Sequence, residues 1–293
     1  MIRKKRRFLV VFLIIFLCCS GIFIFYISNP ANFRDLKNEI RNAFREDTIQ
    51  DSYNAKSLLM VDLSNNEIFI SKNEEKQQLP ASLAKLFVIE YAATLINLDD
   101  IVLVSSETIA LTKPGSSIAN IQEKEYYIHN LFAAMLVPSG NDAAYVIADY
   151  CGELLSPNAK TSQERIEIFM DQLNQYLKEE EYKNTVLYDP SGFDTEARTT
   201  VIDLEKVVKK LLTYKWFRDI VSQQTYTATL PDKTIQTWEN TNIFLDTTSE
   251  YYNENVIGIK TGSLSDDYNL VVLYKMHGKE FLICSLGLSL IHI

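Results

Sequence analysis

Apolar and polar positions alternate in two different ways along the main part of the chain. Short apolar stretches with a period of two, separated by turn residues, predict strands near its two ends. Longer segments that are apolar on one side or nearly all round predict helices between them. The expected strands are 58–63, 67–71, 256–260, 269–275 and 280–286. The expected helices are 81–96, 131–137, 143–150, 163–181 and 201–214.

This order of elements predicts one α+β domain rather than two independent ones. Strands at both ends with helices between them favour a fold in which the terminal strands share one sheet. The first two strands flank the turn Ser64-Asn65-Asn66 and are expected to form a hairpin. We find no internal repeat and no Pro- or Gly-rich linker that would mark a second domain.

The N-terminal part of the chain contains a different pattern, a run of 20 residues without a charge at 8–27. A helix of this length spans roughly 30 Å, the thickness of the hydrocarbon core of a bilayer. A cleaved signal peptide is the alternative, but its apolar region normally covers about 7–15 residues and ends at small residues. This run is longer and leads into Asn29-Pro30, so we expect an uncleaved transmembrane helix.

Charge sets the expected orientation of that helix. Residues 1–7 contain five cations and no acid, and cytoplasmic cations determine which side a helix end occupies. We therefore expect a cytoplasmic tail at 1–7, a single-pass anchor in the cell membrane at 8–27 and an amphipathic stem at 28–52. The remaining body, 53–293, is then extracytoplasmic.

Composition excludes two classes of protein. The chain has 29 Lys+Arg against 38 Asp+Glu, a net charge of −9, and five of the cations lie in the first seven residues. Nucleic-acid affinity comes mainly from Lys and Arg on phosphates, so a body this acidic is not expected to bind nucleic acid. Four cysteines, of which Cys18 and Cys19 are adjacent, do not build a disulfide scaffold.

Candidate chemistry begins with Ser82-Leu83-Ala84-Lys85, at the start of the expected buried helix. Residues three apart share one face of a helix, so Lys85 lies beside Ser82. Burial of a lysine in an apolar helix disfavours its charge and lowers its pKa. A serine next to such an amine is an activated nucleophile, although a Ser/Lys pair at this spacing also arises by chance.

Two further segments are candidates for a site. Ser139-Gly140-Asn141 forms a polar loop between two apolar helices, where buried polar groups need hydrogen bonds or line a cavity. Asp142 is expected to cap the helix that follows, which leaves Asn141 free. Lys260-Thr261-Gly262 ends an expected strand, where Gly262 permits close approach to the backbone; a solvated strand end is the alternative.

The three segments in this order form the motif set of class A β-lactamases and penicillin-binding proteins. The surrounding sequence resembles the D-alanyl-D-alanine carboxypeptidases, the low-molecular-mass penicillin-binding proteins, over roughly 55–288. The segments that carry the resemblance are 79–86, 137–144, 189–194, 240–242 and 258–262. The resemblance implies a mainly antiparallel sheet flanked by helices, with a helical subdomain.

The resemblance also implies a reaction, trimming of the terminal D-alanine from peptidoglycan stem peptides. Ser82 would attack the D-Ala-D-Ala carbonyl while Lys85 takes its proton. Backbone N–H groups of Ser82 and Ser263 would form the oxyanion hole. Ser139 would relay a proton to the leaving D-alanine.

Substrate binding is assigned in the same way. Asn141 would hold the acyl amide, and Lys260 with Thr261 and Gly262 would bind the terminal carboxylate beside Ser263. β-Lactams would bind covalently at the nucleophile. No metal or cofactor is required by this chemistry.

Two alternative functions remain open at this stage. A class A β-lactamase needs a glutamate that activates the deacylating water, and Met170 stands at the expected place of that residue. A membrane-tethered β-lactam sensor or wall-binding module would acylate without turnover.

The resemblance leaves two local differences. Asp266-Asp267 follows the third segment where the family usually has small residues, so the charge of the site is expected to differ. The family also has a further helix after the last strand. We therefore expect the chain to be incomplete at its C-terminus and one face of 280–286 to be poorly covered.

Overall fold

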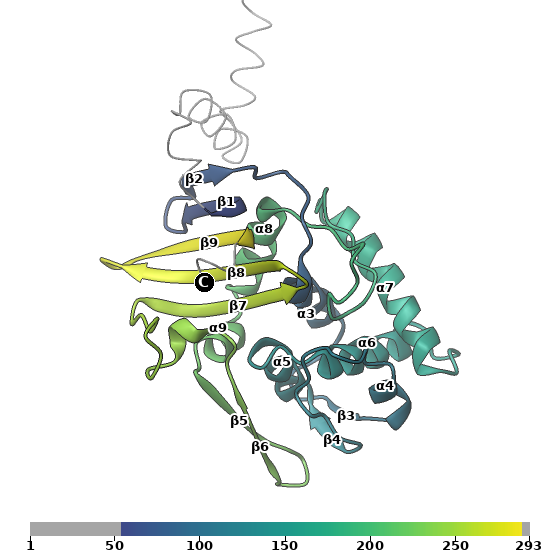
Figure 1. Cartoon of the computed structure of the whole chain (residues 1–293). Coiled ribbons are helices and arrows are strands. Elements are labelled where there is room, and N and C mark those ends of the chain that lie inside the picture. The colour runs from purple at the N-terminus through teal and green to yellow at the C-terminus, as the bar shows by residue number, and fades with distance from the viewer. Residues whose placement is uncertain (1–53, 289–293) are drawn as a thin grey trace, which may run out of the picture.

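The computed structural model describes residues 54–288, and in it the two ends of this stretch meet in one sheet (Figure 1). The first two strands, β1 (Ala55–Asp62) and β2 (Glu67–Lys72), form the expected hairpin. The last three are β7 (Val256–Leu264), β8 (Asp267–Met276) and β9 (Lys279–Leu288). The order is β2-β1-β9-β8-β7, with every neighbouring pair antiparallel. The prediction that the terminal strands share a sheet is confirmed.

The segment between these strands is largely helical, as predicted. A 3₁₀ turn at Ala81–Leu83 leads into the first described helix. The helices are α3 (Ala84–Leu95), α4 (Ser106–Ala110), α5 (Ile128–Leu136), α6 (Asn141–Leu155), α7 (Ser162–Glu179), α8 (Val201–Leu211) and α9 (Lys215–Val221). The short helices α4 and α9 were not predicted, because helices of five and seven residues are too short to show a clear period of 3.6 residues.

The helices form two groups, which also contact each other through α3 with α8 and α5 with α9. α8 packs against β1 and β9, and α9 packs against β7. α4, α6 and α7 pack on one another, with α3 and α5 joined to α6, and these helices form the region to the right of and below the sheet in Figure 1. This group is the helical subdomain that the resemblance implies.

The other described elements are two small hairpins, β3 (Ile101–Leu103) with β4 (Glu125–Tyr127) and β5 (Thr225–Thr229) with β6 (Ile235–Glu239), and a 3₁₀ turn at Ile243–Leu245. The hairpins were not predicted, because strands of three to five residues leave little periodicity to detect. Trp238 on β6 donates from Nε1 to the carbonyl of Ala119 at 2.8 Å. The second hairpin thereby supports the loop between α4 and β4, which borders the site described below.

The two faces of the sheet are covered unequally. One face is buried against helices, with Leu59, Val271 and Leu282 at 0–1% exposure. On the other face Val272 is buried, whereas Met60, Leu270 and Ile283 remain partly exposed. The expectation that one face of the last strand is poorly covered is therefore confirmed in part.

Three predictions concern segments outside the described residues: the cytoplasmic tail, the transmembrane helix at 8–27 and the stem at 28–52. Within 54–288, no helix is long and apolar enough to cross a membrane. Cys151 and Cys284 are buried free thiols.

Candidate active site

The site is built on the turn that precedes α3. Ala81 has φ +47°, a left-handed conformation that costs a residue with a Cβ roughly 1 kcal/mol or more. The next residue, Ser82, is partly exposed, and Lys85 at the first turn of α3 is completely buried. Lys85 Nζ lies 3.0 Å from Ser82 Oγ. The structure therefore brings the serine and the lysine together as the sequence predicted.

Two further groups surround the lysine amine. Nζ donates to Asn141 Oδ1 at 2.6 Å and to the carbonyl oxygen of Ser191 at 2.8 Å. Burial lowers the pKa of Lys85 to about 7, although the carboxylates of Asp189 and Asp142 oppose the shift. A neutral amine has two N–H donors and one lone pair. With both donors used, the lone pair is left for the proton of Ser82.

The second segment forms a tight corner between α5 and α6. Ser139 has φ +63°, and the Gly140 N–H donates to the Ala134 carbonyl at 2.8 Å. An added Cβ at Gly140 would lie 2.6 Å from Ala119 Cβ and 2.9 Å from the Ala134 oxygen. Only glycine fits this corner, which places Ser139 at the surface of a cavity and Asn141 at the start of α6.

The predicted capping role of Asp142 is wrong. The N-cap position of α6 is Gly140, without a side-chain cap, and Asp142 is already inside the helix. Its carboxylate accepts from the N–H groups of Ala119, Ile121 and Ala143 at 2.8–2.9 Å. Asp142 thus fixes the 119–121 loop against α6, a long-range role that a local sequence pattern does not reveal.

The third segment lies inside β7 rather than at its end. The strand continues to Leu264, which pairs with Asp267, because β8 extends the pairing by four residues beyond Lys260. The alternative of a solvated strand end is also wrong, since Lys260 is 1% exposed. Its Nζ donates to the Thr261 carbonyl at 2.9 Å. Burial and the nearby Lys85 charge hold the pKa of Lys260 well below its ordinary value.

The sheet also holds the nucleophile turn in place. An added Cβ at Gly262 would lie 3.1 Å from the Pro80 oxygen and 3.2 Å from the Leu83 nitrogen, so β7 and the turn touch at backbone distance. From β8, Asn269 Nδ2 donates to the carbonyls of Leu79 and Pro80 at 2.9 and 3.0 Å. The sequence analysis missed Asn269; a buried asparagine in an otherwise apolar strand was the available signal.

A cavity of about 490 Å³ opens beside these residues. Five of the predicted site residues line it, namely Ser82, Ser139, Thr261, Gly262 and Ser263. Lys85, Asn141 and Lys260 are buried beside the cavity. Lys85 contacts Ser82 and Asn141, and Lys260 contacts the carbonyl of Thr261. The structure thus brings all eight predicted site residues into one place.

The cavity wall includes residues that the sequence analysis did not single out. Ser117 and Thr241 line it, and Thr241 Oγ1 lies 2.6 Å from Thr261 Oγ1. From the site the cavity continues over the partly covered face of the sheet, past Leu270 to Leu58. The negative charge of Asp267 is paired with Lys56, whose Nζ lies 2.5 Å from Oδ1.

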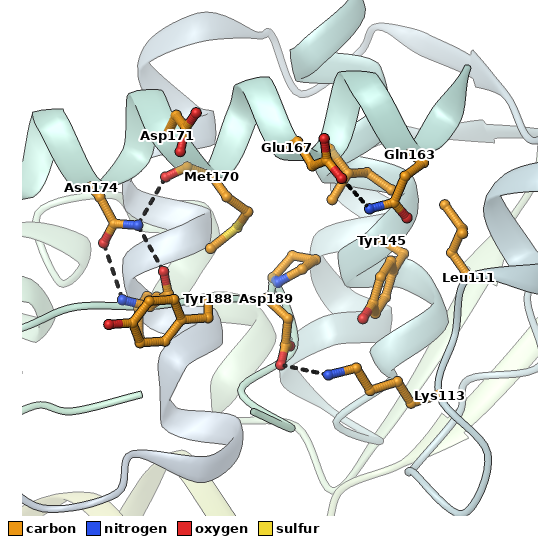
Figure 2. A pocket seen from close by; sticks show the side chains of 13 residues that line it. Leu111, Lys113, Tyr145, Gln163, Glu167, Met170, Asp171, Asn174, Tyr188 and Asp189 are labelled. Atoms are coloured by element: carbon orange, nitrogen blue, oxygen red, sulfur yellow. Dashed lines mark hydrogen bonds and ion pairs between the residues drawn. The ribbon is translucent and has the colours of Figure 1, made fainter. Parts of the chain in front are cut away.

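A second cavity, of about 580 Å³, lies between α6, α7 and the 187–190 loop (Figure 2). Met170 lines this cavity from α7, and it is not among the hydrogen-bond partners of Lys85. The segment that reaches Lys85 from this side is 189–193, through the Ser191 carbonyl. Met170, at the sequence position of the β-lactamase glutamate, therefore lines the second cavity and not the cavity beside Ser82.

No group of three or more His, Cys, Asp or Glu side chains within 54–288 is arranged to hold a metal ion. The reactive groups in this part of the chain are a serine, two buried lysines and amide or hydroxyl groups. This set supports acyl transfer through an activated serine.

The fold and the site together define the class of penicillin-interacting serine peptidases. The structure of the Streptomyces K15 DD-transpeptidase superposes on 82% of this chain and 92% of its own, with a TM-score of 0.71 and 23% identity. The family model for D-alanyl-D-alanine carboxypeptidases, peptidase family S11, matches residues 44–283. The chain belongs to this family.

The chain matches only part of the length of its individual relatives, at about 30% identity or below. A D-alanyl-D-alanine carboxypeptidase from Streptomyces sp. strain K15 is 28% identical over 181 residues, which are 59% of this chain and 58% of the relative. The carboxypeptidase DacD from Escherichia coli K12 is 30% identical over 149 residues, 48% of this chain and 36% of the relative. The chain thus matches between about a third and three fifths of these two relatives.

Proposed function

We propose that the protein is a serine-type D-Ala-D-Ala carboxypeptidase that acts on peptidoglycan stem peptides through a Ser82 acyl-enzyme. The observation that carries the proposal is the 3.0 Å contact between Lys85 Nζ and Ser82 Oγ, with the other contacts of Nζ made to Asn141 and the Ser191 carbonyl. This arrangement leaves the amine one free direction, toward the nucleophile. Membership of the carboxypeptidase family supports the same reaction.

In the proposed acylation, Ser82 Oγ attacks the carbonyl carbon of the penultimate D-alanine, and its proton passes to Lys85 Nζ. The C–N bond to the terminal D-alanine then breaks, and the leaving amine takes a proton relayed through Ser139. Water completes the cycle by hydrolysing the ester, which regenerates the Ser82 hydroxyl. The N–H groups of Ser82 and Ser263 would stabilise the oxyanion in both steps.

Substrate recognition is assigned to residues of β7 and to Asn141. Lys260 and the hydroxyl of Thr261 would bind the terminal carboxylate of the substrate, and the negative charge of that carboxylate would favour the ammonium form of Lys260 against the effect of burial. Thr241 contacts the Thr261 hydroxyl and orients it. Asn141 accepts from Lys85 through Oδ1, so its Nδ2 group would donate to the acyl carbonyl.

The test uses the full chain in detergent with penicillin and with a diacetyl-Lys-D-Ala-D-Ala peptide. We expect a stable mass adduct on Ser82 after penicillin treatment, D-alanine release from the peptide, and loss of both in Ser82→Ala. A β-lactamase would turn penicillin over without a lasting adduct. A sensor would form the adduct and release no D-alanine. Either result would replace the proposed activity.

We further propose that the chain is a single-pass membrane protein with a cytoplasmic tail at 1–7, an anchor at 8–27, a stem at 28–52 and an extracytoplasmic peptidase domain. The support is the uncharged run of 20 residues and the five cations before it. An extracytoplasmic domain also fits a substrate in the cell wall.

A further inference from the structure

The 189–193 segment packs directly against the nucleophile turn. Its Ser191 carbonyl accepts from Lys85 Nζ at 2.8 Å. An added Cβ at Gly192, which has φ +78°, would lie 2.0 Å from the Ala81 oxygen and 2.8 Å from Ala84 Cβ. The segment therefore contacts both the base and the strained residue before Ser82.

One carboxylate holds this segment in shape. Asp189 Oδ1 accepts from the backbone N–H groups of Ser191, Gly192 and Phe193 at 2.7, 2.8 and 3.3 Å, and from Ser191 Oγ at 2.6 Å. Four donors on one oxygen fix the turn that directs the Ser191 carbonyl toward Lys85.

The second oxygen of Asp189 is buried and has no hydrogen-bond partner. Its nearest cation is Lys113, whose Nζ lies 3.8 Å away at the edge of the second cavity (Figure 2). The Asp189 side chain is 7% exposed and that of Lys113 is 42% exposed. Lys113 therefore balances the buried charge only in part, because its own charge is screened by solvent.

Three charged groups on neighbouring elements act on Lys85. Asp189 faces it from the 189–193 segment and Asp142 from α6, and both favour the protonated amine. Lys260 on β7 is the nearby cation and is coupled to Lys85 by repulsion. Of these groups, Asp189 is the one that also determines the position of a hydrogen-bond partner of the amine.

We propose that Asp189 is a positioning residue for Lys85: it sets the conformation of 191–193 that presents the Ser191 carbonyl to Nζ, and Lys113 modulates how much of its charge Lys85 experiences. The proposal rests on the proposed function, in which Lys85 accepts the proton of Ser82. Lys113, at the edge of the second cavity, would thus influence the reaction through the charge of Asp189 and without contacting the substrate.

The test is the pH dependence of the rate of penicillin acylation, measured on the full chain in detergent, for wild type, Asp189→Asn and Lys113→Met. The Asp189→Asn substitution retains an Oδ1 acceptor and removes the charge, so the midpoint of the acid limb is expected to fall by about 0.5–1 pH unit. Lys113→Met leaves Asp189 uncompensated, so its midpoint is expected to rise by about 0.2–0.5 unit. In the double variant the midpoint should match that of Asp189→Asn.

The matched control is Asp171→Asn, which changes an exposed carboxylate that lines the same cavity from α7, outside the 189–193 segment, and its midpoint should equal that of wild type. A lower plateau with an unchanged midpoint in Asp189→Asn would mean that the residue is only structural. If Asp189→Asn does not fold, Lys113→Met decides, and the absence of an upward shift overturns the proposal. Failure of the wild type to acylate at any pH would instead contradict the proposed function.

Discussion

At the residue scale, burial gives Lys85 its chemistry. A lysine with an ordinary pKa is protonated at neutral pH and has no lone pair to accept a proton. In this chain complete burial lowers the pKa to about 7, and the Asp189 and Asp142 carboxylates prevent a larger fall. A base whose pKa lies near the working pH combines a populated neutral form with enough basicity.

The first prediction follows from this shift. Above pH 7 the amine is mostly neutral and able to accept the proton of Ser82, and below pH 7 it is mostly protonated. The rate of acylation by penicillin is therefore expected to rise with pH through a midpoint near 7, and one unit below that midpoint to be about a tenth of its plateau value at high pH. Rates measured from pH 5 to 9 on wild type would check this, and a flat profile would exclude Lys85 as the base.

At the element scale, several segments meet the nucleophile turn at backbone distance. Gly262 of β7 approaches it from the sheet, the Asn269 side chain of β8 donates to its carbonyls, and Gly192 packs against Ala81 from the 189–193 segment. The positive φ of Ala81 persists because these several contacts together fix the conformation of the turn.

The second prediction concerns Gly192→Ala. The new Cβ would clash with backbone atoms of Ala81, and residue 192 itself has a left-handed conformation that alanine disfavours. We therefore expect the free energy of unfolding to fall by roughly 2–4 kcal/mol. Acylation should slow at least tenfold, because the Ser191 carbonyl moves with the loop. Thermal unfolding and the rate of penicillin labelling measure the two effects.

Gly278→Ala is the matched control. Gly278 has a similar φ of +77°, and a Cβ there has no neighbour within 4 Å. It should cost only the backbone strain, roughly 1–2 kcal/mol, and leave the labelling rate of the folded protein unchanged. Equal effects of the two substitutions on labelling would refute the role given to the 192 contact.

At the scale of the whole molecule, the sheet joins chain ends that are far apart in sequence. β1 pairs with β9, from Ala55 with Leu288 to Asp62 with Phe281, and this pairing closes the domain. Lys56 and Asp267 add a charge contact between β1 and β8. The start of β1 is therefore fixed to the sheet, and any anchor before it holds the whole domain near the membrane.

The third prediction tests that arrangement. Five cations before the apolar run predict a cytoplasmic N-terminus, so protease added to intact spheroplasts should degrade the body. A cytoplasmic marker protein should survive in the same sample and be lost after detergent lysis. A protected body, or a mature N-terminus near residue 31, would contradict the anchor.

Much of the fold was predictable, because long periodic segments report their own structure. The helices containing 84–95, 162–179 and 201–211 were found to within three residues of their observed limits, and all five terminal strands were found, although β7 continues four residues beyond its expected end. The hairpins at 101–127 and 225–239 were not, since their strands are short and depend on each other and on the adjacent loop. A local sequence pattern does not predict an element whose stability comes from long-range contacts formed on folding.

By itself the sequence determined the candidate residues for the proposed chemistry, because Ser82, Lys85, Ser139 and Lys260 stand in short motifs whose spacing is meaningful within one helix, corner or strand. Only the tertiary structure decided how they act together. It placed Asn141 and the Ser191 carbonyl on the lysine amine, buried Lys260 inside β7 and assigned Asp142 to a distant loop. These contacts join residues about 20 to 100 positions apart, and such distances are set by packing of the whole chain rather than by any local pattern.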